Sequence, residues 1–149
     1  MSWRYGVLTV VVWLGLCLSG PSWAGPALEA GERASQAGNL DEALAAYRQA
    51  VADEPGSALA HTRLGGILLL KQQYAGAIGS FKTAIGLDSD NADAFIGLGI
   101  AFLHQGEYGL ARAALAEALQ RKPSRKQEID QVLVWLDARE GGAPAAQHP

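Results

Sequence analysis

A spacing of 34 residues recurs along this chain, and it limits the folds that the sequence can adopt. Three sets of small residues and one set of large apolar residues repeat at this spacing. The sets are Gly31, Gly65 and Gly99; Ala43, Ala77 and Ala111; Ala50, Ala84 and Ala118; and Tyr47, Phe81 and Leu115. Pro55 and Pro123 lie two periods apart, with Ser89 midway between them. A fixed period of about 20–50 residues is typical of an array of stacked structural units.

Each unit contains the pattern of two helices. In the second unit, Leu64, Leu68 and Leu69 form one apolar stripe at helical spacing, and a second stripe runs from Ala77 to Ile85. Ser57 and Asn91 precede helices, where short polar side chains cap free N–H groups. No segment alternates as a strand would. The sequence therefore predicts an all-α fold, a superhelical array of three helix hairpins followed by a capping helix.

At these positions the chain resembles the tetratricopeptide repeat family. The family pattern of Leu-Gly, Ala, an aromatic residue, Ala and a closing Pro is matched by Leu64-Gly65, Ala77, Phe81 and Ala84. The third unit has Leu115 for the aromatic residue, the first has Ala30 for Leu, and Ser89 replaces one Pro. The usual Trp near the start of each unit is replaced by Ala27, His61 and Phe95. The resemblance implies repeats at about residues 24–57, 58–91 and 92–125.

One more helix is predicted after the last repeat, over residues 124–140. Ser124 and Gln127 resemble a capping box, and an apolar stripe follows at Ile129, Val132, Leu133 and Leu136. A repeat array needs a terminal element with a polar outer face. The final residues, 141–149, have no apolar periodicity, so we expect them to be disordered.

The first 24 residues are typical of a secretory signal peptide. Arg4 supplies a positive charge, residues 7–18 form an apolar run, and Ser22-Trp23-Ala24 provides small residues for cleavage after Ala24. We expect a periplasmic or secreted protein that loses its one cysteine, Cys17, with the signal. An alternative is an uncleaved inner-membrane anchor at residues 5–18, although this run is shorter than the ~20 residues of a spanning helix. A lipoprotein signal at Cys17 is disfavoured because Leu16 stands where a small residue is required.

Composition and motifs exclude several classes of function. The 12 Lys and Arg against 15 Asp and Glu leave a net charge of −3, which argues against a nucleic-acid partner. The histidines, His61, His104 and His148, form no ligand or catalytic motif with other residues. Gly97-Leu98-Gly99 lies inside a predicted helix, so it lacks the context of a phosphate loop. We therefore expect no enzyme activity, metal, cofactor or small-molecule substrate.

The first helices of stacked repeats line a concave side, which is the predicted binding surface. Its candidate residues lie between the packing positions: Thr62, Gly66, Leu69, Leu70, Ile96, Ile100 and Leu103. Some members of the family clamp a C-terminal carboxylate with Lys, Asn and Arg on these helices. The corresponding positions here hold Leu28, Thr62 and Ile96, then Glu32, Gly66 and Ile100, so we expect an apolar or amphipathic partner segment.

The predicted function is that of a protein-binding adaptor or assembly factor of the bacterial cell envelope. An alternative is a structural subunit that self-associates into a homo-oligomer. Trp135, at the edge of the capping helix, is either a packing residue or an interface anchor. The basic residues Arg121, Lys122, Arg125 and Lys126 are interpreted as a solvated face near a helix end. Membrane contact is expected only through an uncleaved anchor.

Overall fold

The computed structural model describes residues 25–121 and 123–141. In these residues it contains seven helices and no strand. The helices are α1 (Pro26–Gln36), α2 (Leu40–Asp53), α3 (Ala58–Leu70), α4 (Tyr74–Leu87), α5 (Ala92–His104), α6 (Tyr108–Gln120) and α7 (Lys126–Gly141). The all-α prediction is therefore confirmed.

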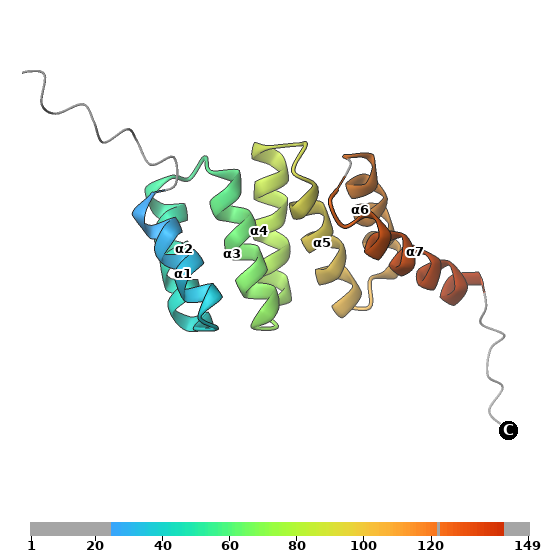
Figure 1. Ribbon diagram of the computed structural model, residues 1–149. Coiled ribbons are helices and arrows are strands. Elements are labelled where there is room, and N and C mark those ends of the chain that lie inside the picture. Colours follow the sequence, from blue (N-terminus) through green and yellow to red (C-terminus); the bar gives the residue numbers. More distant parts are fainter. Residues whose placement is uncertain (1–24, 122, 142–149) are drawn as a thin grey trace, which may run out of the picture.

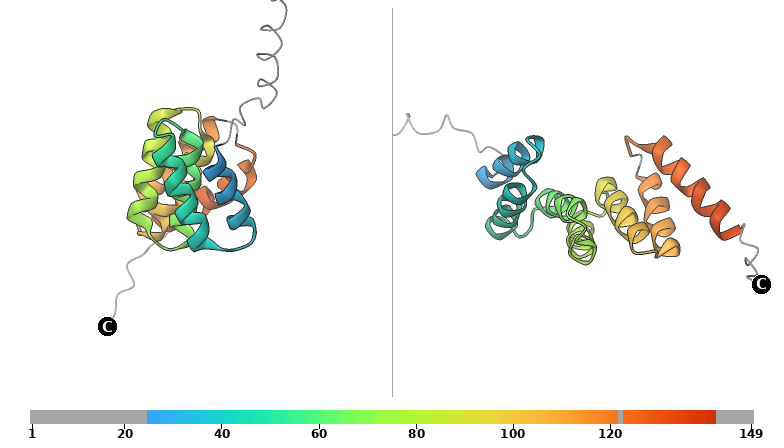
Figure 2. Two further views of the ribbon diagram at one scale, coloured as in Figure 1. Left: turned by 90° about the vertical axis from the view of Figure 1, so that its left-hand side faces the viewer. Right: turned by 90° about the horizontal axis from the view of Figure 1, so that it is seen from below.

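Consecutive helices form pairs that stack along one direction (Figure 1). The pairs are α1 with α2, α3 with α4, and α5 with α6, and α7 follows at the end. Seen from below, each pair is rotated relative to the one before it, so the stack is a superhelix (Figure 2). This arrangement confirms the predicted array of three hairpins with a terminal helix.

Glycine allows the two helices of each pair to approach closely. A Cβ atom added to Gly65 would lie 2.8 Å from Cε1 of Phe81, and one added to Gly31 would lie 2.5 Å from Cε1 of Tyr47. In the third pair, a Cβ on Gly99 would lie 2.7 Å from Cγ of Leu115. Real Cβ atoms are not found so close to other side chains, so only glycine fits. The alanines of the 34-residue period are buried beside these contacts: Ala43, Ala50, Ala77, Ala84, Ala111 and Ala118.

Local signals start and end the helices as the sequence predicts. The Ser57 hydroxyl accepts a hydrogen bond from the Ala60 N–H at 3.3 Å, and Asn91 Oδ1 accepts one from the Ala94 N–H at 2.9 Å. Gly38 and Gly106 end the first helices of their pairs with φ of 78°. The same position in the second pair is Gln72, with φ of 60°. Pro55 and Pro123 follow the ends of α2 and α6, where proline is common.

The last helix, α7, takes the place of the first helix of a fourth pair. It begins at Lys126, which is 34 residues after Ala92 at the start of α5. The helix begins two residues after the predicted start at residue 124, and Arg125 directly precedes it. Leu133 occupies the position that is Gly31, Gly65 and Gly99 in the three pairs. A leucine there leaves no room for the close approach of a second helix.

Three parts of the chain lie outside the described residues, one of them the single residue Lys122 of the predicted basic face. The second is residues 1–24, which hold the predicted signal peptide, the alternative anchor and Cys17. The third is residues 142–149, most of the predicted disordered tail, with His148. Within residues 25–121 and 123–141, no helix is long and apolar enough to cross a membrane.

Candidate functional site

A groove of about 460 Å³ lies on the side of the array formed by the first helices. Helix α3 contributes the largest part of its lining, α5 forms the facing side, and α1 and the segment before α7 complete its ends. We call it the concave groove and define it by Arg63, Gly66, Leu69, Leu70, Asp93, Ile100 and Arg125. The helix pairs thus place on one surface residues that are up to 62 positions apart in the sequence.

The predicted binding residues lie in two adjoining hollows. Five of the seven line the concave groove: Thr62, Gly66, Leu69, Leu70 and Ile100. Ile96 and Leu103 line a smaller cavity next to it, together with Ile100. Leu70 is 64% exposed, and Gly66, Leu69, Ile100 and Leu103 are half-buried. Apolar side chains with this exposure are available to a partner.

Thr62 and Ile96 are buried instead. The Thr62 hydroxyl donates to the Ala58 carbonyl at 2.8 Å and accepts from Asn91 Nδ2 at 2.9 Å. Its hydrogen-bonding capacity therefore links α3 to the start of α5. Ile96 is only 3% exposed because it packs in the cluster that α7 covers. Thr62 thus lines the groove as a buried residue, and Ile96 lines the smaller cavity.

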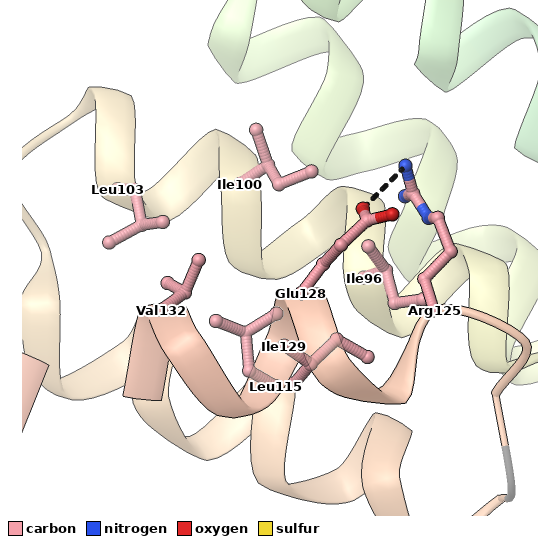
Figure 3. Close-up of a pocket in the computed structure, with 8 residues that line it drawn as sticks. All are labelled: Ile96, Ile100, Leu103, Leu115, Arg125, Glu128, Ile129 and Val132. Carbon is pink, nitrogen blue, oxygen red and sulfur yellow. Dashed lines mark ion pairs between the residues drawn. The ribbon is translucent and has the colours of Figure 1, made fainter. Parts of the chain in front are cut away.

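The smaller cavity lies between α5, α6 and α7 and has a volume of about 80 Å³. We call it the socket; it is lined by Ile96, Ile100, Leu103, Leu115, Ile129 and Val132 (Figure 3). Ile96, Leu115 and Ile129 are buried and form its floor, and the other three are half-buried at its rim. Ile100 and Arg125 line both the socket and the concave groove. The terminal helix is therefore part of the site and not only a cap.

Charged side chains border the groove in alternating sign. Arg63 Nε lies 3.4 Å from Glu32 Oε1, joining α3 to α1, and Arg125 Nη1 lies 3.8 Å from Glu128 Oε2 beside the socket. Asp93 has no ion pair among residues 25–121 and 123–141. Sequence reasoning did not assign Arg63 or Asp93 to the groove, and it interpreted Arg125 only as part of a solvated face near a helix end. Arg63 directly follows Thr62, which was a predicted binding residue. This adjacency was the one clue in the sequence that Arg63 lies at the groove.

Tyr47 lies below the groove and is 2% exposed. Burial raises the pKa of its hydroxyl, and the nearby Arg63 guanidinium partly opposes this rise. The phenol is therefore neutral at physiological pH. It supplies packing against Gly31 and is not an activated nucleophile.

The histidines of the described chain make local contacts. His61 Nε2 lies 3.0 Å from the Pro55 carbonyl oxygen, to which it donates a hydrogen bond. The His104 ring stacks on Tyr74, with centroids 5.0 Å apart and planes at 6°. Across residues 25–121 and 123–141, no three His, Cys, Asp or Glu side chains come together as a metal site would require.

Trp135 lies on α7 and is 49% exposed. Its ring meets the edge of Tyr108 on α6, with centroids 6.1 Å apart. The Arg139 guanidinium lies over both rings, 5.2 Å from the Trp135 centroid and 4.9 Å from that of Tyr108. One side of the indole thus packs on α6, while the other remains open to solvent.

A known family model matches the repeat region of this chain. The family model described as tetratricopeptide repeat matches residues 28–92 and 72–126, about two thirds of the chain. The chain belongs to the tetratricopeptide repeat family. Tetratricopeptide repeat domains are protein–protein interaction modules.

Solved structures of the family share this fold. The TPR2B domain of yeast Sti1, in a pHsp70 complex, is 22% identical with a TM-score of 0.74, covering 78% of this chain and 97% of that domain. The second TPR domain of human RPAP3, in complex with the HSP70 peptide SGPTIEEVD, is 24% identical with a TM-score of 0.71. The match covers 76% of this chain and 94% of that domain. MamA is 24% identical with a TM-score of 0.73, and the match covers 77% of this chain and 67% of MamA. At these identities the likeness shows the fold alone.

A curated relative in sequence is the general transcriptional corepressor trfA of Dictyostelium discoideum. The two are 30% identical over 96 residues, or 64% of this chain. The matched stretch is only 7% of the length of that relative. The likeness therefore does not carry the activity of the larger protein to this chain.

Proposed function

We propose that this protein is a non-catalytic adaptor or assembly factor of the bacterial cell envelope, which binds a segment of a partner protein in the concave groove. The observation that carries the proposal is the open groove on the first-helix side of a tetratricopeptide repeat array. Its apolar residues include Leu70, which is 64% exposed in the absence of a partner. Solvent-exposed apolar surface of this kind is stabilised by docking of another protein.

Structural relatives support binding of a protein segment by this fold. The Sti1 and RPAP3 domains are described in complex with pHsp70 and with an HSP70 peptide, respectively. Here the first-helix positions that clamp a carboxylate in some family members hold Leu28, Thr62 and Ile96, and all three are buried in packing. The partner is therefore expected to be an apolar or amphipathic segment rather than a free C-terminal carboxylate.

The envelope location rests on the sequence of residues 1–24. A positive start, an apolar run and small residues before the cleavage position support export and cleavage near Ala24. The chain after Ala24 contains no cysteine, which suits an oxidising compartment. Intact-mass measurement of the protein from exporting cells tests this part: a mass beginning at Gly25 is expected, and one beginning at Met1 favours the membrane anchor at residues 5–18.

Site-specific photo-crosslinking tests the groove. A photoreactive amino acid in place of Leu70 lies in the groove, and one in place of Leu87, exposed at the end of α4, is the matched control outside it. We expect an adduct with another protein from Leu70 only. Equal adducts from both positions, or none from Leu70, would contradict groove binding.

The second candidate is a self-associating structural subunit. Trp135 is 49% exposed and Val134 is 67% exposed on α7, an unusual exposure for residues of this size. An adduct of the Leu70 variant with a second copy of the chain, together with a stable oligomer in sedimentation at low concentration, would favour this function over the adaptor.

A further inference from the structure

The shape of the groove indicates what kind of side chain its partner presents. The socket opens beside the groove at Ile100. Its walls are mostly aliphatic side chains from α5, α6 and α7, and Arg125 and Glu128 also line it (Figure 3). An apolar cavity of about 150 Å³ admits benzene. The socket, at about 80 Å³, is about half that size, so it suits a small branched aliphatic side chain better than a whole aromatic ring.

The charges of the groove indicate what lies beside that side chain. The groove and its rim carry three carboxylates and two guanidinium groups: Glu32, Asp93 and Glu128, and Arg63 and Arg125. Each guanidinium already lies within 4 Å of one carboxylate, Arg63 with Glu32 and Arg125 with Glu128. Of these three carboxylates, Asp93 is the one that has no ion pair with another residue in the described part of the chain. Its place in the first turn of α5 suits the helix dipole but supplies no counter-charge.

We propose that the groove binds a partner segment in which a Val, Leu or Ile side chain enters the socket and a neighbouring Lys or Arg faces Asp93. This inference rests on the proposed function, because it specifies the partner of the same groove. It also separates this protein from the structural relative whose bound peptide is SGPTIEEVD, an acidic sequence. The groove here has no surplus of positive charge to attract such a peptide.

The terminal helix is part of this recognition. Val132 of α7 forms the rim of the socket opposite Ile100 and Leu103 of α5. The socket therefore exists only while α7 is packed on the last pair. Partner binding and the docking of α7 stabilise each other, because a group that binds only the docked state favours that state.

A random twelve-residue peptide library displayed on phage, selected on the full chain, tests the inference. We expect the retained peptides to share an aliphatic residue with a Lys or Arg near it. In synthetic versions of these peptides, replacing the aliphatic residue with Gly should weaken binding about tenfold or more, since a buried aliphatic side chain contributes that much.

Variants of the protein assign the two contacts. Asp93→Lys should weaken binding of the basic peptides about fivefold, as expected for a solvent-exposed ion pair, and Asp53→Lys on α2 is the control with the same charge change. Val132→Phe fills the socket and should exclude the aliphatic side chain. Val132→Ile fills it partly with less effect on packing, so it replaces the Phe variant if the melting temperature of that variant falls.

The outcomes distinguish this inference from the proposed function. Gly66→Leu places a side chain in the open groove, where no atom lies within 4 Å of an added Cβ. If retained peptides lose binding to Gly66→Leu but are acidic, lack an aliphatic residue or ignore the Val132 and Asp93 variants, the inference is wrong and groove binding stands. If no retained peptide depends on Gly66, both the proposed function and the inference are wrong.

Discussion

The Asn91 side-chain amide donates a 2.9 Å hydrogen bond to the hydroxyl of Thr62, joining the start of α5 to the middle of α3. The same amide accepts from the Ala94 N–H, so it caps α5 while it holds α3. Thr62 is 8% exposed and also donates to the Ala58 carbonyl. One short polar pair therefore links the second and third helix pairs beside the concave groove, which Thr62 lines.

We predict that Thr62→Val destabilises the fold by about 1–3 kcal/mol, because the Asn91 amide loses its acceptor in a partly buried place. Thr62→Ser keeps the hydroxyl and should retain most of the stability. Urea unfolding followed by circular dichroism measures both variants. A loss for Ser with none for Val would show that packing of the threonine methyl, which Val keeps, and not the hydrogen bond, holds the two pairs.

The ring of Phe81 gives a second prediction, because it lies between glycines of two different pairs. A Cβ added at Gly65 or at Gly97 would overlap this ring. We expect Gly97→Ala to cost about 1–3 kcal/mol through overpacking. Gly66→Ala is the matched control: it also lies inside a helix, has no atom within 4 Å of an added Cβ, and should gain about 0.5–1 kcal/mol.

The Gly97 prediction has an independent check. In the double variant Gly97→Ala with Phe81→Leu, the smaller side chain removes the overlap, so the two changes should cost less together than the sum of each alone. If the losses of unfolding free energy of the two single variants simply add in the double variant, the alanine at position 97 does not overlap the ring of Phe81.

Much of this packing could be predicted from the sequence, but only inside each unit. Gly65 and Phe81 belong to the 34-residue period, so their contact follows from the repeat. Gly97 does not, because Arg63 and Gln131 stand at its equivalent positions. Contacts between units depend on the rotation from one pair to the next, and a period in the sequence does not encode that angle.

The sequence likewise could not predict which apolar residues of α5 lie in the groove and which lie in the core. Ile96 and Ile100 are one helical turn apart, and both belong to the apolar surface of α5. Ile96 is buried only because α7 lies over it, while Ile100 stays at the rim of the socket. The packing direction of a terminal helix is a tertiary property, so the stripe of α7 predicts its burial but not which residues it covers.

Gln72 gives a third prediction, because it adopts a left-handed conformation with φ of 60°. The equivalent residues in the other two pairs are Gly38 and Gly106. A side chain costs roughly 1–2 kcal/mol in this region, partly offset because glycine is more flexible when unfolded. Gln72→Gly should therefore stabilise the protein by about 0.5–1 kcal/mol, and Gly106→Gln should destabilise it by about the same amount. Thermal unfolding that shifts both variants in one direction would contradict this account.

The ion pair between Lys71 Nζ and Asp41 Oδ1, at 2.5 Å, predicts a dependence of stability on pH. The hydrogen bond from Lys71, and then its charge, hold the pKa of Asp41 below its ordinary value of 3.8. A lowered pKa in the folded state stabilises the protein above the unfolded pKa, and this contribution is lost as the pH falls through the folded pKa. Asp41→Asn should therefore lose less stability on acidification below pH ~4 than the parent chain.

The control for this prediction is Lys71→Met, which removes the partner and should flatten the acid limb in the same way. The double variant should show no further change. Since Asp41 is exposed, salt at about 1 M should also reduce the difference between parent and variant by screening. A parent-like acid limb in Asp41→Asn would assign the acid sensitivity to other carboxylates.

Trp135 supports a final prediction that separates packing from association. Its ring packs edge-on against Tyr108 under the Arg139 guanidinium, and an aromatic pair of this geometry contributes about 0.5–1.5 kcal/mol beyond its buried area. We expect Trp135→Ala to lower the unfolding free energy by at least this amount and Trp135→Phe to recover part of it. If the indole only packs on α6, the parent chain and both variants will have the same sedimentation coefficient. They will also retain the same peptides from the phage library. If Trp135 instead anchors a second copy, Trp135→Ala will convert an oligomer to a monomer, and the loss of stability will then depend on protein concentration.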